Sequence, residues 1–139
     1  MDFTLDQRLA DSSHLVIRSD DIQVRLADDS RYVWLLLIPE KAAAEELHDL
    51  TGDLRDRLFT LAAHLGGWMK TTFTADKINV AAIGNMVPQL HLHIVARRHG
   101  DAAWPGPIWG HGEPVPLSET ERQRLTAAIA TFLETGETG

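Results

Sequence analysis

Two histidines in the stretch Gln89 to Val95 are the side chains of this chain best suited to chemistry. His91 and His93 stand two residues apart, and the residues between and after them are apolar. Side chains alternate between the faces of a strand, so Gln89, His91 and His93 are expected to form a polar row on one face. The leucines and the isoleucine between them would then pack against the core. A polar row of this kind is where a ligand would bind.

Three kinds of chemistry would suit such a row. Two histidines could bind a metal with a third ligand, for which the candidates are His48, His99 and His111. Arg97 and Arg98 follow directly, however, and cations beside a metal raise its electrostatic cost. A Ser-His-Asp hydrolase is disfavoured because no serine stands in a Gly-x-Ser-x-Gly context. In the third interpretation an imidazole is itself the nucleophile, because a histidine with a pKa near ~6.5 is largely unprotonated at neutral pH and can attack phosphorus.

The segments around the row predict an antiparallel sheet. Alternating or continuous apolar patterns indicate five strands, at residues 14–19, 22–27, 32–39, 77–84 and 89–98. An Asp-rich turn joins the first two, Pro39 ends the apolar third, and a turn at Gly84 and Asn85 joins the last two. The histidine row therefore belongs to the last strand of the sheet.

A long helix is expected between the third and fourth strands. Leucines recur at helical spacing within residues 45–73, beginning at Leu54, and form one apolar stripe. Thr51 can cap the start of this helix. A short helix is also expected over residues 1–13. The apolar stripe of the long helix should pack on the sheet.

The C-terminal part of the chain predicts one more helix. A capping box from Ser118 to Glu121 opens it, and its apolar residues continue to about residue 134, so it spans about 118–134. Together the elements predict a single α+β domain over residues 1–139, with a core at about 10–110.

Composition narrows the set of partners. The chain has 139 residues, of which 44% are hydrophobic, and its formal charge is -7. An acidic protein is not expected to bind nucleic acid nonspecifically, although one pocket can still hold a small anion. The absence of cysteine excludes disulfides and thiolate chemistry. No stretch resembles a secretory signal or a membrane span, so no membrane association and a cytoplasmic location are expected.

The stretch Gln89 to Val95 resembles the signature of the histidine triad (HIT) family, which reads His-φ-His-φ-His-φ-φ with φ apolar. Glutamine replaces the first histidine here. Further features follow in the family's order: Ile-Pro-Glu at 38–40, His-Asp-Leu at 48–50, Lys-Ile-Asn-Val at 77–80, the Gly-Asn turn and Trp-Pro at 104–105. The resemblance implies a HIT-like fold over roughly the whole predicted core.

The resemblance also implies roles for the residues of the row. His91 matches the middle histidine, which in family members attacks the α-phosphate and forms a nucleotidyl-histidine that water then resolves. His93 matches the third histidine, and its charged form would stabilise developing negative charge. Gln89 could form hydrogen bonds but could not carry a proton, and Met86 removes a hydroxyl that family members often direct at phosphate. Both departures point to an altered substrate or a low activity.

Substrate contacts are implied at several other positions. Three residues match family positions near the nucleotide: His48, Asn79 and Asn85. Arg97 should share the face of the two histidines and could bind a polyphosphate with its guanidinium. Trp104 and Trp109 could wall the site or contact a partner subunit.

The expected function is a HIT-type hydrolase or transferase that acts on the α-phosphate of a nucleoside phosphate. A dinucleoside polyphosphate is one such substrate, as for diadenosine polyphosphate hydrolases. Two alternatives stay open: a nucleotide-binding or sensing protein with little turnover, which Gln89 and Met86 favour, and a metal-binding β-domain, which only the histidine count favours. No resident cofactor is expected, although a divalent cation can accompany the substrate. The family also implies a homodimer.

Overall fold

Five strands form one antiparallel sheet. The computed structural model describes residues 2–136. In chain order the elements are α1 (Gln7–Asp11), β1 (Ser13–Ser19), β2 (Ile22–Ala27), β3 (Val33–Pro39), the 3-10 turn η1 (Leu47–Asp49), α2 (Gly52–Thr72), β4 (Lys77–Ala82), β5 (Leu92–Arg97) and α3 (Glu119–Thr135). The strands lie side by side in the order β1-β2-β3-β5-β4. The predicted α+β class is confirmed. The ends of the predicted domain, residue 1 and residues 137–139, lie outside the described residues.

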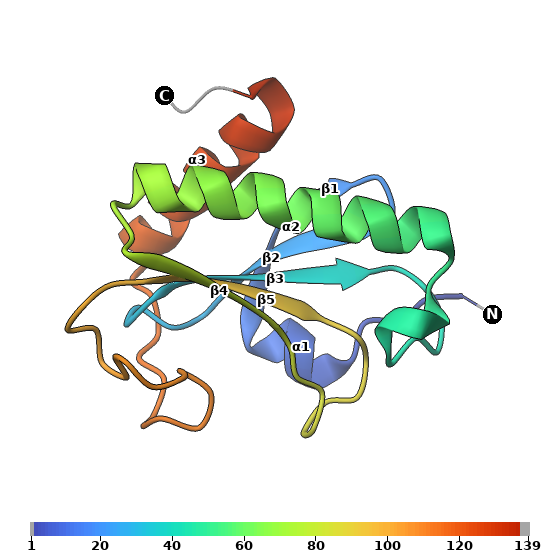
Figure 1. Cartoon of the computed structure of the whole chain (residues 1–139), viewed down its shortest axis with the longest axis horizontal. Helices are drawn as coiled ribbons and strands as arrows, with labels where there is room; N and C mark the ends of the chain where they lie inside the picture. Colours follow the sequence, from blue (N-terminus) through green and yellow to red (C-terminus); the bar gives the residue numbers. More distant parts are fainter. Residues whose placement is uncertain (1, 137–139) are drawn as a thin grey trace.

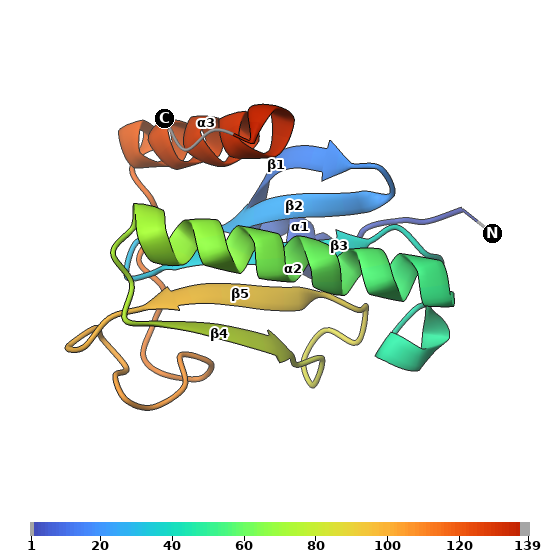
Figure 2. The same cartoon turned by 45° about the horizontal axis from the view of Figure 1, so that its top comes forward.

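The two faces of the sheet are covered by different parts of the chain. Helix α2 lies along one face, and α3 lies beside it next to β1 (Figures 1 and 2). Helix α1 and the long connection between β5 and α3 lie on the opposite face (Figure 1). In residues 2–136, none of the helices combines the length and the apolar character needed to cross a bilayer.

The stripe of α2 packs against β5 as the sequence predicts. Leu54 and Leu58 are buried, and they share one cluster with Leu92 and Ile94 of β5. The helix runs without a break through its two glycines, and Gly66 lies against β4. A Cβ atom at Gly66 would be 3.3 Å from Ile78 Cγ2, so glycine allows a close approach of the helix to the sheet.

The long helix begins where its cap was predicted, but the residues before it do not belong to it. Thr51 Oγ1 accepts a hydrogen bond from the Leu54 amide at 3.2 Å and caps α2. The preceding residues form the separate turn η1, because the Asp49 carboxylate accepts from the amides of Glu45 and Glu46 at 3.1 and 2.9 Å. Helix α2 therefore begins at Gly52, after its cap Thr51, and not at Glu45.

Helix α1 and strand β5 differ most from their predicted lengths, and β4 ends at Ala82 instead of residue 84. Helix α1 covers only Gln7–Asp11, because the chain before it is tied to Gln89: its Oε1 accepts from the Asp6 amide and its Nε2 donates to the Thr4 carbonyl, both at 2.8 Å. Strand β5 begins at Leu92, since the Leu90 amide donates to the Ala44 carbonyl at 3.0 Å and leaves the strand ladder. Gln89 and His91 thus lie outside the strand that was expected to carry them.

Packing of α2 on the sheet predicts a large effect of Leu58. This side chain is fully buried, whereas the neighbouring Phe59 is 43% exposed. Leu58→Ala should lower the free energy of unfolding by about 3 kcal/mol, because it leaves a cavity in the core. Phe59→Ala should cost less than about 1 kcal/mol. Urea unfolding followed by circular dichroism measures both, and equal losses would contradict this packing.

Candidate active site

The histidine of β5 faces away from the helix-covered core. His93 pairs in register with Leu36 of β3 and Ala81 of β4. Its neighbours Leu92 and Ile94 belong to the core cluster beneath α2. Because side chains alternate along a strand, His93 lies on the opposite face, beneath α1 and the connection to α3. The predicted separation of apolar and imidazole faces is confirmed at these positions.

The backbone fixes the proton of His91 on one ring nitrogen. Nδ1 of His91 lies 2.7 Å from the carbonyl oxygen of Gln89. A carbonyl only accepts hydrogen bonds, so in the neutral ring Nδ1 must carry the proton. The lone pair then resides on Nε2, which is the state required of a nucleophile. His91 is 6% exposed and lines two cavities that meet at its ring.

His93 is held as a neutral ring by an indole donor. Trp34 Nε1 lies 3.0 Å from His93 Nδ1, and an indole nitrogen can only donate, so Nδ1 accepts and the proton of the ring resides on Nε2. Burial lowers the pKa of His93 to about 3, with a further contribution from His91, while a hydrogen bond with the Ile83 backbone acts in the opposite direction. His93 is therefore neutral at neutral pH, and the prediction that it carries a charge is wrong.

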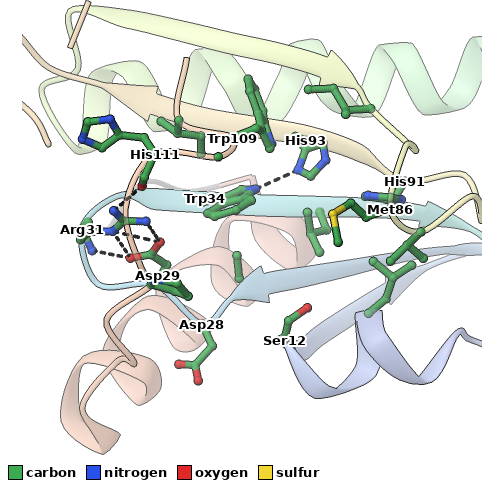
Figure 3. A pocket seen from close by; sticks show the side chains of 18 of the residues that line it. Ser12, Asp28, Asp29, Arg31, Trp34, Met86, His91, His93, Trp109 and His111 are labelled. Atoms are coloured by element: carbon green, nitrogen blue, oxygen red, sulfur yellow. Dashed lines mark hydrogen bonds and ion pairs between the residues drawn. The ribbon is translucent and has the colours of Figure 1, made fainter. Parts of the chain in front are cut away.

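A cavity of about 560 Å³ opens beside the two histidines. Apolar and aromatic side chains form much of its lining: Leu9, Trp34, Leu36, Ile108 and Trp109. Trp34 and Trp109 lie next to the imidazole of His93, with ring centroids 5.7 and 5.1 Å from it (Figure 3). His91 and His111 lie at opposite ends of this cavity (Figure 3). The walls suit a planar ring, and the histidine end offers a nucleophile.

Residues 108–116, here called the closing segment, form one wall of the cavity and are tied to the β2–β3 connection. Arg31 donates to the His111 carbonyl at 2.7 Å, and the Val115 amide donates to Asp29 at 3.4 Å. Arg31 and Asp29 also form an ion pair at 2.8 Å. Burial alone would raise the pKa of Asp29, but the hydrogen bonds from Arg31 and the backbone outweigh it and lower that pKa. The carboxylate stays ionised and holds the wall in place.

A second cavity of about 400 Å³ is also lined by His91. It shares Ile83, Asn85 and His91 with the first cavity. Polar side chains distinguish its lining: Glu45, Glu46, His48 and Gln89. Of the residues named from sequence, His48 and Asn85 thus line this cavity, and Trp109 lies beside His93 in the first cavity. Gln89 also reaches the second cavity, but both ends of its amide are bound to the N-terminal segment.

Three other residues named from sequence lie elsewhere. Arg97 does share the face of His93, but it is 1% exposed and donates to Asp101 at 2.8 Å, Asn79 at 2.8 Å and the Gly106 carbonyl at 2.9 Å. The same guanidinium lies over the indole of Trp104, with Arg97 Cζ 5.5 Å from the ring centroid. In the described part of the chain, Arg97, Asn79 and Trp104 line neither cavity. The guanidinium that was expected to bind a polyphosphate is occupied by the protein itself.

The site contains residues that sequence reasoning did not name. Trp34 was assigned only to an apolar interior strand, and Asp29 and Arg31 were not singled out at all. Strand register is the signal that could have found Trp34, because pairing it with Val95 places the indole beside the histidine face. The hydrogen bonds of Arg31 with the His111 carbonyl and of Asp29 with the Val115 amide have no such local signal, because their partners are 80 or more residues away in the sequence.

Metal binding finds no support in the arrangement of ligands. Within residues 2–136, the structure places no three side chains of His, Asp or Glu together in a way that could hold a metal ion. His91 and His93 are neighbours, with ring centroids 4.8 Å apart, but His93 Nδ1 accepts from Trp34 and its lone pair is engaged. The site is therefore better described by imidazole chemistry.

The low pKa of His93 predicts an acid sensitivity. This pKa is about 3 in the folded chain, whereas an unfolded histidine titrates near ~6.5. The unfolded state therefore binds the proton first, and lowering the pH from ~6.5 towards 3 should favour unfolding by up to about 1.4 kcal/mol per pH unit. His93→Gln removes this titration. Urea unfolding between pH 4 and 7 should show a shallower loss for the variant, and equal slopes would contradict a buried neutral His93.

The buried Arg97 predicts a structural penalty rather than a binding defect. Its ion pair with Asp101 has side-chain exposures of 2% and 9%, whereas the Arg124–Glu121 pair has 59% and 41%. Arg97→Ala should cost about 3–5 kcal/mol, because it leaves Asp101 uncompensated. Arg124→Ala should cost less than about 1 kcal/mol. Arg97→Lys keeps the charge but loses the planar guanidinium, so its loss of unfolding free energy should be intermediate. Urea unfolding measures all three variants, and a cost of less than about 1 kcal/mol for Arg97→Ala would refute the structural role of Arg97.

Comparison with known proteins agrees with this geometry. The chain matches the HIT domain over residues 8–100. A histidine triad protein from Marinobacter aquaeolei VT8 is 40% identical with a TM-score of 0.93, over 96% of this chain and 98% of that one. Histidine triad proteins from Sinorhizobium meliloti 1021 (39% identity, TM-score 0.88, 90% and 93% coverage) and Bradyrhizobium japonicum (38%, 0.89, 93% and 96%) are also similar. No curated protein sequence matches the chain. The chain belongs to the HIT domain family.

Proposed function

We propose that the chain is a nucleotide hydrolase or transferase in which Nε2 of His91 attacks the α-phosphate of a nucleoside phosphate. One observation carries the proposal: the 2.7 Å contact of His91 Nδ1 with the Gln89 carbonyl, which leaves the lone pair on Nε2. A covalent nucleotidyl-histidine divides one difficult displacement into two easier ones. Membership of the HIT family supports a nucleotide as the substrate.

The first cavity is the proposed nucleoside site. Its volume of about 560 Å³ lies within the range of ordinary small-molecule sites. Trp34 and Trp109 offer aromatic surface to a base, and Asp28 offers a carboxylate that can accept hydrogen bonds from sugar hydroxyls. A nucleoside in this cavity would bring its 5′-phosphate to the end where His91 lies.

The charges around the two cavities favour a leaving group with little negative charge. Carboxylates line both cavities: Asp11, Asp28 and Asp29 the first, Glu45 and Glu46 the second. Arg31 also lines the first cavity, but it is paired with Asp29. A polyphosphate chain would therefore bring several charges to walls that offer it little compensation. We rank a nucleoside phosphate with an uncharged or cationic leaving group above a dinucleoside polyphosphate.

A nucleotide-binding protein with little turnover is the second candidate. Two observations favour it: Gln89 uses its amide to hold the N-terminal segment, and Met86 presents an 85% exposed apolar side chain at the first cavity. Neither side chain can donate a proton to a leaving group. Tight binding without product would identify this case.

The homodimer stays a prediction of the resemblance, and the cytoplasmic location stays a prediction of the sequence. Strand β4 pairs with β5 and forms one edge of the sheet. Its Val80 is 47% exposed, so this edge is where a second copy could add to the sheet.

The nucleophile is tested by an adduct experiment. Wild type is mixed with adenosine and guanosine 5′-(4-nitrophenyl phosphate) and with a dinucleoside tetraphosphate, and product release and intact mass are measured. We expect a nucleotidyl adduct and turnover in wild type, and a loss of roughly 10³-fold or more in His91→Ala. His64→Ala, which alters an exposed imidazole on α2, serves as the control. An adduct that persists in His91→Ala would refute the proposal.

A further inference from the structure

A leaving group needs a proton, and the histidine row does not supply one. Gln89 replaces a titratable residue, and its amide is bound to the backbone of Thr4 and Asp6. His93 accepts a hydrogen bond from Trp34, and its pKa of about 3 leaves it neutral. His91 is itself the proposed nucleophile. The proton must therefore come from a residue outside the row or from solvent.

Two further imidazoles border the cavities, and they lie in different places. His111 lines the first cavity, at the end opposite His91 (Figure 3). His48 lines the second cavity, which shares His91 and Asn85 with the first cavity but not its tryptophans. An imidazole is the side chain that exchanges protons most readily near neutral pH. Only the position of His48 is compatible with a phosphorus atom at His91 and a nucleoside in the first cavity.

The fold presents His48 without burying it. It lies in η1, directly before α2, and its side chain is 84% exposed. Its Nε2 lies 3.9 Å from Asp49 Oδ1, and the Asp49 carboxylate is anchored by the amides of Glu45 and Glu46. The turn is therefore fixed while the imidazole stays accessible to a group that enters the cavity. This combination suits a proton donor rather than a packing residue.

We infer that the second cavity receives the leaving group and that His48 is the general acid that protonates it. This inference rests on the proposed function, because it requires the phosphorus to be attacked by His91. Neither the glutamine that replaces the first triad histidine nor the neutral His93 would then take part in proton transfer.

The step is balanced in bonds and protons. In the first half, the bond between His91 Nε2 and phosphorus forms, the bond to the leaving oxygen or nitrogen breaks, and that atom takes a proton from the His48 imidazolium. In the second half, water attacks phosphorus, the neutral His48 takes a proton from this water, and the lone pair returns to His91 Nε2. The products are a nucleoside monophosphate and a protonated leaving group, and His48 ends in its starting state.

The lining of the second cavity also indicates the chemical class of the leaving group. Glu45 and Glu46 border it together with Leu47, Pro88 and Leu90. Anionic walls beside apolar ones disfavour a phosphate chain and accommodate an uncharged or cationic organic group. Aryl alcohols are therefore suitable probes, since they are uncharged and their acidity can be varied at nearly constant size.

The experiment compares leaving groups of graded acidity. Phenyl, 4-chlorophenyl and 4-nitrophenyl esters of adenosine 5′-monophosphate are assayed for kcat/KM with wild type, His48→Gln and the control His64→Gln. A poor leaving group needs its proton in the transition state, whereas 4-nitrophenolate does not. We expect His48→Gln to lose roughly 100-fold with the phenyl ester and no more than about 2-fold with the 4-nitrophenyl ester. The dependence of log kcat/KM on leaving-group pKa should become steeper in this variant alone.

Each outcome decides the inference. An unchanged slope in an active His48→Gln, or an equal loss with all three esters, would overturn the role of His48 as a proton donor and leave His91 untouched. If wild type forms neither adduct nor product from the 4-nitrophenyl ester, the proposed function itself fails. Since His48 is exposed and glutamine keeps its polarity, a folding defect is not expected, and circular dichroism of the variant checks this.

Discussion

The covering of both faces of β5 is the constraint on which the rest of the site depends. One face carries Leu92 and Ile94 into the core beneath α2. The other carries His93, Val95 and Arg97 beneath the connection to α3, where they are also buried. A buried polar group needs a partner for each donor and acceptor, or its desolvation is not offset. The strand can therefore carry imidazole and guanidinium groups only because the neighbouring elements supply those partners.

Those partners give the polar residues in and just before β5 different roles. Arg97 is fully engaged by carboxylate, amide and carbonyl oxygens, so it stabilises the start of the connection that builds the wall. His93 accepts a hydrogen bond from the Trp34 indole and is held as a neutral ring. His91, just before the strand, uses one nitrogen for the Gln89 carbonyl and keeps the other for chemistry. The surrounding hydrogen bonds thus leave the lone pair of His91 Nε2 as the one on which the proposed reaction depends.

Periodicity was sufficient to predict the parts of the fold that depend on local pattern. The α2 stripe, its Thr51 cap, the order of strands along the chain and the two faces at His93 all follow from spacing. The partners of Arg97 could not be predicted, because a strand pattern gives the face of a side chain but not what covers it. The same holds for Gln89, whose position suggested a triad member. Its amide is instead occupied by a segment more than eighty residues earlier in the sequence.

The two ends of this site come from different parts of the chain, because the closing segment forms one wall and the histidines lie earlier in the sequence. The match to the HIT domain ends at residue 100, whereas the wall that carries Ile108, Trp109 and His111 comes after it. The proposed nucleophile and its hydrogen bonds thus belong to the part that matches the HIT domain, and much of the surface that would contact a base lies outside that match. Substitutions in the closing segment can alter which nucleoside fits while the reacting nitrogen stays in place. Relatives with the same two imidazoles can therefore differ in substrate, and membership of the family alone does not determine which base this protein accepts.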